Sequence, residues 1–353
     1  MSSPAHNDAH GSVFVTGGSG FLGINLIRYL LAHGLPVVSL DIADFDYPER
    51  RLIRAVTGDV RDYHTLRDAM RGASIVVHCA VALPSYPASE IMSTDVAGTR
   101  HVLEAAWEHG IQRVVHISST AMYGRKATGT PEDGHTELLG PYAEAKVLAE
   151  RECLEYRRRG MSVPILRPKT FVGPERLGIW AILFDWAYSG SGFPLIGDGR
   201  NRYQLLDVED LCDVVYAVMM GPTAQVNDTF NVGAKVFGSM KDDFQAVLDH
   251  AGHGKKVRAL PAWPVVTGLK ILERLRLSPV YEWVYETAAA DSYVSIAKAE
   301  RVLGFRPKYS NREALIRNYD WYVSQRPHIL QTSGVSHRVP WKQGLIGLGK
   351  KIF

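Results

Sequence analysis

Short apolar runs and longer amphipathic segments alternate along the first half of the chain. Val13–Val15 is an apolar run, and residues 21–33 after it carry apolar side chains at helical spacing. A second apolar run, 36–40, ends at Asp41. The alternation continues with strands predicted near 53–57, 74–78, 113–118 and 162–166, and with helices near 64–71, 91–109 and 142–159.

This order of elements predicts an α/β fold. Strands that alternate with helices form βαβ units, and right-handed crossovers then build a doubly wound parallel sheet, the Rossmann fold, with helices on both faces. Ligands of such sheets bind at the carboxyl ends of the strands. Polar residues that follow the predicted strands are therefore the first candidates for function.

The pattern loosens after residue 170, where glycine, proline and aromatic residues become more frequent. We expect a first domain built on the parallel sheet and a smaller, partly helical C-terminal lobe that closes over the bound ligand. The first domain is predicted to cover 12–170 and to take back 205–220, the lobe to cover 171–204 and 221–325, a disordered tail to cover 1–11, and a basic amphipathic tail to cover 326–353.

Composition narrows the class of protein. Of the 353 residues, 46 % are hydrophobic and 22 % are charged, and the formal net charge is +3, so we expect a globular protein without a nucleic-acid interface. Cys79, Cys153 and Cys212 form no CxxC pair, which argues against a metal site and for a reducing cytoplasm. No apolar stretch reaches the roughly 18 residues of a spanning helix.

A glycine-rich turn follows the first predicted strand. Gly17, Gly20 and Gly23 have GxxGxxG spacing and stand between that strand and the start of a helix. The first glycine permits a tight turn, the second lets the backbone approach a pyrophosphate, and the third lets the helix pack closely. The N–H groups where the helix begins, at Phe21 and Leu22, favour phosphate. The turn therefore predicts a dinucleotide site.

Two aspartates extend this predicted site. Asp41 ends the second strand, where a carboxylate can accept hydrogen bonds from adenosine ribose hydroxyls and would repel a 2′-phosphate. No arginine follows it directly, so NAD is favoured over NADP. Asp59 and Val60, after the third strand, are expected at the adenine edge. Both aspartates have an alternative role as ordinary turn residues.

Tyr142 and Lys146 are four residues apart at the start of a predicted helix, so their side chains lie on one face. A neighbouring ammonium favours phenolate and lowers the tyrosine pKa, as proton transfer at a carbinol or carbonyl oxygen requires. Ser119 follows a strand upstream, and Ser119 and Thr120 are expected to contact the substrate. Tyr142, Lys146 and Ser119 are the predicted catalytic residues.

These motifs together resemble the extended short-chain dehydrogenase/reductases, and among them the NAD-dependent epimerase/dehydratases. The resemblance rests on TGGSGFLG at 16–23, SSTAMYG at 118–124, YAEAK at 142–146, RPKTFVGP at 167–174 and KAERVLGFRP at 298–307. It implies hydride transfer between a secondary alcohol or ketone and nicotinamide C4. Tyr142 would be the general acid/base, Lys146 would also bind the nicotinamide ribose, and Ser119 would orient the substrate oxygen. It also implies a homodimer through the helices near 91–109 and 142–159.

Two segments of the cofactor domain depart from the pattern that the resemblance implies. The segment HCAV at 78–81 stands where the family often has His-x-Ala-Ala, so valine replaces the last alanine. Small residues such as Ala80 leave room there for the cofactor. Asp95 stands where the family usually has the asparagine of Asn-Val-x-Gly-Thr. A proton relay through that asparagine would have to differ here. A structural role for Asp95 is the alternative.

A third departure concerns the substrate. Tyr203 begins YQL, where nucleotide-sugar enzymes of the family commonly have Arg-Asp-Phe and the arginine contacts the diphosphate. Arg200 or Arg202 would compensate, because arginine suits bidentate phosphate contact, or both would face solvent. Tyr203, Arg200 and Arg202 are therefore candidate substrate-binding residues.

Three functional hypotheses remain open. The resemblance favours a nucleotide-sugar epimerase or dehydratase. The altered segment 200–206 and the apolar residues of 261–287, which would form lobe core or line an apolar pocket, favour a dehydrogenase or reductase of a hydroxysteroid-like or ceramide-like lipid. A non-catalytic NAD(H)-sensing protein is the third, and the intact Ser119, Tyr142 and Lys146 argue against it.

The C-terminal tail suggests one further partner. Apolar residues at helical spacing accompany basic ones, so the tail is expected either to lie on an anionic membrane surface or to pack on the protein or a partner subunit. Its glycines disfavour a free helix. The apolar positions are Trp341, Leu345, Leu348 and Ile352.

Overall fold

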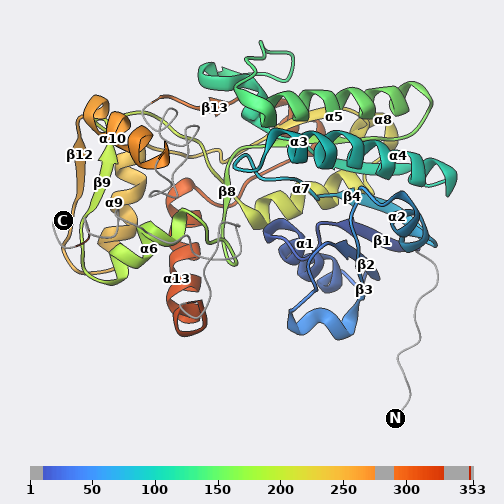
Figure 1. Cartoon of the computed structure of the whole chain (residues 1–353), viewed down its shortest axis with the longest axis horizontal. Helices are drawn as coiled ribbons and strands as arrows, with labels where there is room; N and C mark the ends of the chain where they lie inside the picture. The colour runs from blue at the N-terminus through green and yellow to red at the C-terminus, as the bar shows by residue number, and fades with distance from the viewer. Residues whose placement is uncertain (1–10, 275–289, 330–349, 351–353) are drawn as a thin grey trace. The chain divides into compact units, whose positions relative to one another are not determined.

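The chain folds as two compact units, which are described separately. The computed structural model describes residues 11–274, 290–329 and 350 (Figure 1). Unit 1 comprises Met1–Ser119, Gly140–Arg167 and Cys212–Phe230, and unit 2 comprises Thr120–Leu139, Pro168–Leu211 and Asn231–Phe353.

The division into units differs from the expected domain boundaries in the segment 120–139, which belongs to unit 2. Its strand β6 (Thr128–Thr130) pairs in parallel with β13 (Tyr293–Val294). The Tyr123 hydroxyl donates to Oδ1 of Asn231 at 2.9 Å. The later segment of unit 1 runs over Cys212–Phe230 rather than 205–220. These contacts join residues more than 100 positions apart, so no local pattern indicates them.

Seven strands form the central sheet, in the order β11-β7-β5-β4-β1-β2-β3. Each neighbouring pair from β3 to β7 is parallel, which confirms the predicted doubly wound sheet. The order reverses beside β1, because β2 lies on one side of it and β4 on the other, and ligands of such sheets bind at this point. The strands are β1 (Ser12–Thr16), β2 (Val37–Asp41), β3 (Arg54–Thr57), β4 (Ala73–His78), β5 (Arg113–Ile117), β7 (Ile165–Pro168) and β11 (Thr229–Val232).

Helices bury their apolar faces against this sheet. Phe14, Leu40 and Val76 of the strands and Leu66 and Val102 of the helices are fully buried in one hydrophobic cluster. The helices α4 and α5 lie side by side (Figure 1). The helical segments are α1 (Phe21–Ala32), η1 (Pro48–Leu52), α2 (Tyr63–Met70), α3 (Ala88–Ile91), η2 (Met92–Ala97), α4 (Gly98–Glu108), α5 (Gly140–Arg158), α7 (Val208–Met220) and α8 (Thr223–Val226).

The helix expected over 91–109 contains a π-helical turn. The chain runs from α3 through η2 into α4 without a break, and the Gly98 N–H bonds the carbonyl of Ser93, five residues back. Such single-turn π segments widen a helix locally and are frequent at functional sites. Asp95 lies within the turn.

The described residues of unit 2 form an apolar core of their own and three two-stranded sheets. The pairs are β8 with β10, β9 with β12, and β6 with β13. Trp180, Phe184, Leu315 and Tyr322 are among the buried side chains of the core. Its remaining elements are η3 (Thr120–Lys126), β8 (Phe171–Val172), α6 (Trp180–Tyr188), β9 (Phe193–Ile196), β10 (Leu206–Asp207), α9 (Met240–His250), β12 (Val257–Leu260), α10 (Ala262–Arg274), α12 (Ala297–Leu303) and α13 (Asn311–Ile329).

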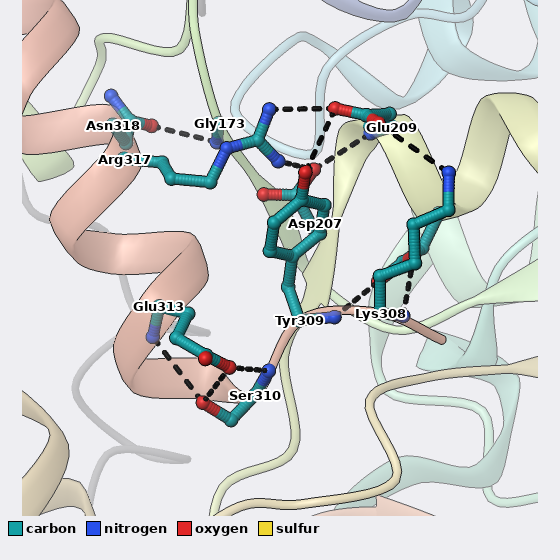
Figure 2. A network of polar contacts seen from close by, with 10 residues as sticks. Gly173, Asp207, Glu209, Lys308, Tyr309, Ser310, Glu313, Arg317 and Asn318 are labelled. Carbon is teal, nitrogen blue, oxygen red and sulfur yellow. Dashed lines mark hydrogen bonds and ion pairs between the residues drawn. The ribbon is translucent and has the colours of Figure 1, made fainter. Parts of the chain in front are cut away.

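A polar network fixes the long helix α13 within unit 2, as Figure 2 shows. The Arg317 guanidinium lies 2.8 Å from Asp207 and 2.7 Å from Glu209, and it stacks on the ring of Tyr309 at 3.9 Å. At the next residue, Oδ1 of Asn318 accepts the backbone N–H of Gly173 at 2.9 Å. These contacts tie the helix to the strands β8 and β10.

Two apolar segments expected near the C-terminus are described only in part. Trp263 of α10, expected in the lobe core or a pocket, is 78 % exposed, because its position near the start of the helix carries it outward. In the tail, the described residue Lys350 pairs with Asp185 of α6 at 2.5 Å. The apolar tail positions, and the segment 275–289, lie outside the described residues. No described helix is long and apolar enough to cross a membrane.

Candidate active site

The glycine-rich turn forms a close-packed cradle between β1 and α1. Gly17 has a φ of +69°, and a Cβ there would lie 2.7 Å from the backbone nitrogen of Ala80. A Cβ at Gly23 would lie 2.2 Å from the Gly17 carbonyl oxygen. Helix α1 begins at Phe21 with no capping side chain and no acidic residue in its first turn. Its N-terminus is therefore suited to the negative charge of a pyrophosphate.

The Asp41 carboxylate lies against this cradle at the end of β2. One oxygen accepts the N–H of Ser19 in the glycine turn at 3.0 Å, and the other accepts the N–H of Ala43 at 2.9 Å. Asp41 therefore caps a turn and also lies beside the predicted dinucleotide site. A carboxylate oxygen can accept more than one hydrogen bond, and the predicted contact with the ribose hydroxyls stays a prediction.

The other predicted cofactor residues have different environments. Arg61 holds the Asp59 carboxylate in an ion pair at 2.6 Å, and hydrogen bonds from Arg61 keep the pKa of Asp59 below its usual value. Val60 and Leu22 are buried. Ala80 donates its N–H to Oγ1 of Thr16 at 3.2 Å, so it does border the glycine turn.

Tyr142 and Lys146 lie on one face of α5, as the spacing predicts. The Lys146 ammonium is 5.4 Å from the centroid of the Tyr142 ring. Lys146 is buried, whereas Tyr142 is partly buried against Ala82, Ile91 and Ala145. Burial opposes the charge of Lys146, but its neighbours, above all the Asp95 carboxylate, outweigh this effect and raise the lysine pKa above its ordinary value. Lys146 is therefore an ammonium at neutral pH.

Two serines follow β5, and their environments differ. The Ser118 hydroxyl is buried and donates to Glu150 at 2.5 Å. Glu150 in turn is held by Arg167 in a two-fold contact at 2.6 and 2.8 Å. The Ser118 hydroxyl is thus used in a buried hydrogen bond within the protein. Ser119, the next residue, is only partly buried and remains the candidate for the substrate oxygen.

The predicted substrate residues of unit 2 do not form one cluster of cations. Thr120 donates its hydroxyl to the carbonyl of Pro168 at 3.2 Å. The Arg200 side chain is 90 % exposed and 3.9 Å from Asp198. Arg202 stacks over the rings of Phe237 and Tyr293, 4.8 Å from each centroid. Their roles toward a substrate stay predictions.

Tyr203 has a cationic neighbour that the sequence analysis did not single out. The Lys169 ammonium lies 5.0 Å from the Tyr203 ring centroid and 2.6 Å from the Ser292 hydroxyl. Burial lowers the pKa of Lys169 to about 7. The sequence signal was a lysine in the segment 167–174, but only the fold shows that the side chain is buried.

A chain of hydrogen bonds joins the glycine turn to the π-helical turn. The His78 ring contacts the Thr16 hydroxyl at 2.7 Å and the Thr99 hydroxyl at 3.0 Å, and Thr99 donates to the Asp95 carbonyl at 2.5 Å. Burial lowers the pKa of His78 to about 3, so its ring is neutral. Among the described residues no group of histidine, cysteine, aspartate and glutamate could hold a metal ion.

The sequence profile of one protein family, described as the NAD dependent epimerase/dehydratase family, matches residues 13–233. That stretch covers more than half of the chain and contains the glycine cradle, Ser119, Tyr142 and Lys146. The chain belongs to this family. The predicted family is therefore confirmed, and NAD, the predicted cofactor, is the cofactor of the family.

Individual relatives differ in their activities. An uncharacterised protein of Sinorhizobium fredii is 31 % identical over 96 % of this chain and 85 % of its own. A dTDP-glucose 4,6-dehydratase of Streptomyces niveus is 27 % identical over 89 % of this chain and 93 % of its own. A 3 beta-hydroxysteroid dehydrogenase/Delta 5-->4-isomerase of Mycobacterium tuberculosis is 29 % identical over 89 % and 91 %.

A solved structure shows the same fold. An epimerase of Methanothermobacter thermautotrophicus superposes with a TM-score of 0.78 and 24 % identity, over 92 % of this chain and 95 % of that one. The family and the relatives support an enzyme of the extended short-chain dehydrogenase type. They include both a nucleotide-sugar enzyme and a steroid dehydrogenase.

Proposed function

We propose that this protein is an NAD-dependent oxidoreductase that acts at a secondary alcohol or ketone carbon, with Tyr142 as the general acid/base. The observation that carries the proposal is the buried Lys146 ammonium, 5.4 Å from the Tyr142 ring, in the same unit as the glycine cradle. NAD, when bound, supplies the hydride acceptor and donor.

The chain's own residues handle the proton. In the oxidative direction the Tyr142 oxygen takes the proton of the substrate hydroxyl, and in the reductive direction it returns a proton to the carbonyl oxygen. The Lys146 ammonium stabilises the phenolate by its charge. Ser119 donates a hydrogen bond to the same substrate oxygen and orients it. Gly17, Gly20 and Gly23 hold the pyrophosphate, and Asp41 accepts from the ribose hydroxyls.

For the substrate we propose a nucleotide-sugar, converted by epimerisation or dehydration. The buried Lys169 beside Tyr203 supports an anionic substrate, because no carboxylate is paired with Lys169 among the ion pairs of the described residues. A phosphate group would provide the missing negative charge. The dTDP-glucose 4,6-dehydratase among the relatives supports the same class.

A hydroxysteroid-like or other hydroxy-lipid substrate is the second candidate. Tyr203 presents an aromatic ring at the position where the family resemblance implies an arginine, and a steroid dehydrogenase is equally similar in sequence. Native mass spectrometry of the purified protein, followed by identification of released small molecules, separates the two. Retained NAD with a nucleotide-sugar supports the first candidate, and NAD(H) with a co-purified lipid supports the second.

The catalytic proposal is tested with Tyr142→Phe. The change removes only the phenolic oxygen, so NAD affinity by calorimetry should stay within a factor of about three of the wild type. Turnover of the substrate found above should fall by about 10²–10⁴, the usual contribution of a general acid/base. Unchanged turnover would remove Tyr142 from the mechanism. NAD binding without turnover in the wild type on either substrate class would favour a sensing role.

We further propose a cytoplasmic homodimer that uses α4 and α5. Trp107 of α4 and Leu154 of α5 are exposed large apolar residues, 43 % and 41 % accessible, which a partner subunit could cover. The described cysteines form no disulfide, in keeping with a reducing compartment. Light scattering after size-exclusion chromatography measures the mass, and Leu154→Glu should shift a dimer to monomer without changing Tyr142.

A further inference from the structure

Asp95 is the most completely buried carboxylate beside the candidate catalytic residues. Its side chain has 0 % exposure, and Oδ2 lies 3.3 Å from the Lys146 ammonium. Oδ1 accepts the backbone N–H of Ala82 at 2.8 Å. Among the described residues, Oδ2 accepts no hydrogen bond from a neutral group, so the compensation of its charge depends on the Lys146 ammonium.

The two neighbours of the Asp95 side chain are both hydrogen donors. Ala82 offers a backbone N–H and Lys146 offers an ammonium. A carboxylate can accept from both sides, whereas an asparagine amide would direct its NH₂ group at one of the two donors. This geometry accounts for aspartate at a position where the family resemblance implies asparagine. The aspartate at this position therefore forms a direct ion pair with Lys146.

The π-helical turn holds this carboxylate in place. The turn lies against α5, and the Asp95 carbonyl accepts the Thr99 hydroxyl at 2.5 Å. Thr99 is bound to His78, which is bound to Thr16 at the start of the glycine turn. Burial keeps His78 neutral, so this chain of contacts adds no competing charge. Asp95 is thus anchored on its backbone side as well as through Ala82.

The charges that surround Lys146 leave Asp95 as its main counter-ion. Burial alone would lower the pKa of Lys146, and Asp95 is the largest of the effects that raise it. Tyr142 and Glu150, on the same helix, act in the same direction but less strongly. Glu150 is already paired with Arg167 at 2.6 Å. The remaining titratable groups near Lys146 are the uncharged His78, Cys79, His116 and Cys153.

We propose that Asp95 is a positioning residue, whose carboxylate keeps Lys146 charged and holds its ammonium beside Tyr142. The catalytic consequence rests on the proposed function, whereas the ion pair itself does not. A surface carboxylate on α5, Glu152, offers a matched control, because it pairs with Arg100 at 2.7 Å but lies outside the site.

The ion pair is tested by a cycle of unfolding midpoints over wild type, Asp95→Asn, Lys146→Met and the double variant. Asp95→Asn leaves the buried Lys146 ammonium facing an amide, and Lys146→Met leaves the buried Asp95 carboxylate without a counter-ion. Each single change should therefore lower the unfolding midpoint. The double variant removes both charges and should unfold at a higher temperature than the sum of the two single shifts predicts. Additive shifts would overturn the proposal. Should Asp95→Asn alone fail to fold, recovery of a folded double variant supports it and continued failure overturns it.

The charge of Lys146 is read directly by NMR of protein that carries [ε-¹³C]lysine, with the signal assigned by its loss in Lys146→Met. In Asp95→Asn the lysine should titrate at least one pH unit lower than in the wild type, a tenfold change in the protonation constant. In Glu152→Gln it should titrate as in the wild type. Equal titration in wild type and Asp95→Asn overturns the proposal.

The catalytic consequence is a selective loss of turnover at alkaline pH. Asp95→Asn should lose at least tenfold more activity than the wild type as the pH rises through the lowered lysine transition, with Glu152→Gln unchanged. A parallel loss at every pH would mark a merely structural defect and overturn the positioning role. If the wild type shows no turnover, the proposed function fails, while the cycle and the lysine titration still decide the ion pair.

Discussion

Burial, rather than the presence of an ion pair, should decide how much a carboxylate on α5 contributes to stability. Glu150 and Glu152 are two residues apart, and each pairs with an arginine at nearly the same distance, 2.6 Å to Arg167 and 2.7 Å to Arg100. The side chains of the first pair are 12 % and 7 % exposed, and those of the second are 55 % and 24 % exposed. The same substitution, glutamate to glutamine, therefore compares a buried pair with a surface pair.

Glu150→Gln should cost about 3 kcal/mol of unfolding free energy. The amide leaves the buried Arg167 without its carboxylate, and breaking a buried pair from one side typically costs about 3–5 kcal/mol. The glutamine oxygen still accepts one hydrogen bond, from Ser118 or the guanidinium, which places the cost at the lower end of that range. Glu152→Gln should cost about 0–1 kcal/mol, as exposed pairs do.

Urea denaturation followed by circular dichroism measures both variants, with thermal melting as a second probe. At about 2–4 °C per kcal/mol, the Glu150→Gln midpoint should fall by about 6–12 °C and the Glu152→Gln midpoint by less than about 4 °C. Equal, small losses in the two variants would show that burial of the Glu150 pair does not stabilise unit 1, and would refute the reasoning.

Three further predictions follow from single residues. Gly23→Ala places a Cβ 2.2 Å from a backbone oxygen, so it should cost about 1–3 kcal/mol and weaken NAD binding at least tenfold by calorimetry, whereas Gly268→Ala in α10, with nothing within 4 Å, should not destabilise. The pKa of Lys169 is about 7 in the folded protein and about 10.4 in the unfolded chain, because folding buries the ammonium. Lys169→Met should therefore stabilise the protein by a few kcal/mol below pH 7, and melting curves should show this difference vanish toward pH 10. Cys153 is fully buried and burial raises the pKa of its thiol, so it should not react with a chromogenic disulfide reagent until the protein unfolds.

For each of these three predictions, one result would contradict it. Wild-type NAD affinity in Gly23→Ala would show that the glycine turn adapts to a side chain. A stability of Lys169→Met that follows the wild-type pH dependence would show that Lys169 is charged and paired in the folded protein. Rapid labelling of Cys153 at neutral pH would show that its burial is not maintained in solution.

Local sequence signals were sufficient for the core of the candidate site. GxxGxxG between a strand and a helix, and Tyr142 four residues before Lys146, are features within a single turn or helix face. Their geometry depends on backbone rules that hold in any protein. The alternation of apolar runs and amphipathic segments predicted the parallel sheet for the same reason, because periodicity follows from which face of each element is buried.

Contacts between distant segments were beyond those signals. The sequence named Asp95 as a departure, but its partner Lys146 is 51 positions away, and only the packing of the π-helical turn on α5 brings the two charges to 3.3 Å. The commitment of Ser118 to Glu150 and the burial of Lys169 likewise depend on which elements pack together. The pKa of a charged group depends on its desolvation and neighbours, and these exist only in the folded chain.

The sequence by itself therefore determined the fold class and the family, and it predicted the glycine cradle and the shared helix face of Tyr142 and Lys146. The tertiary structure decided that the Ser118 hydroxyl bonds Glu150, that Asp95 pairs with Lys146, and that segment 120–139 belongs to unit 2. The physical reason is the range of the interactions: hydrophobic periodicity and turn chemistry act over a few residues, whereas burial and charge pairing act across the whole folded unit.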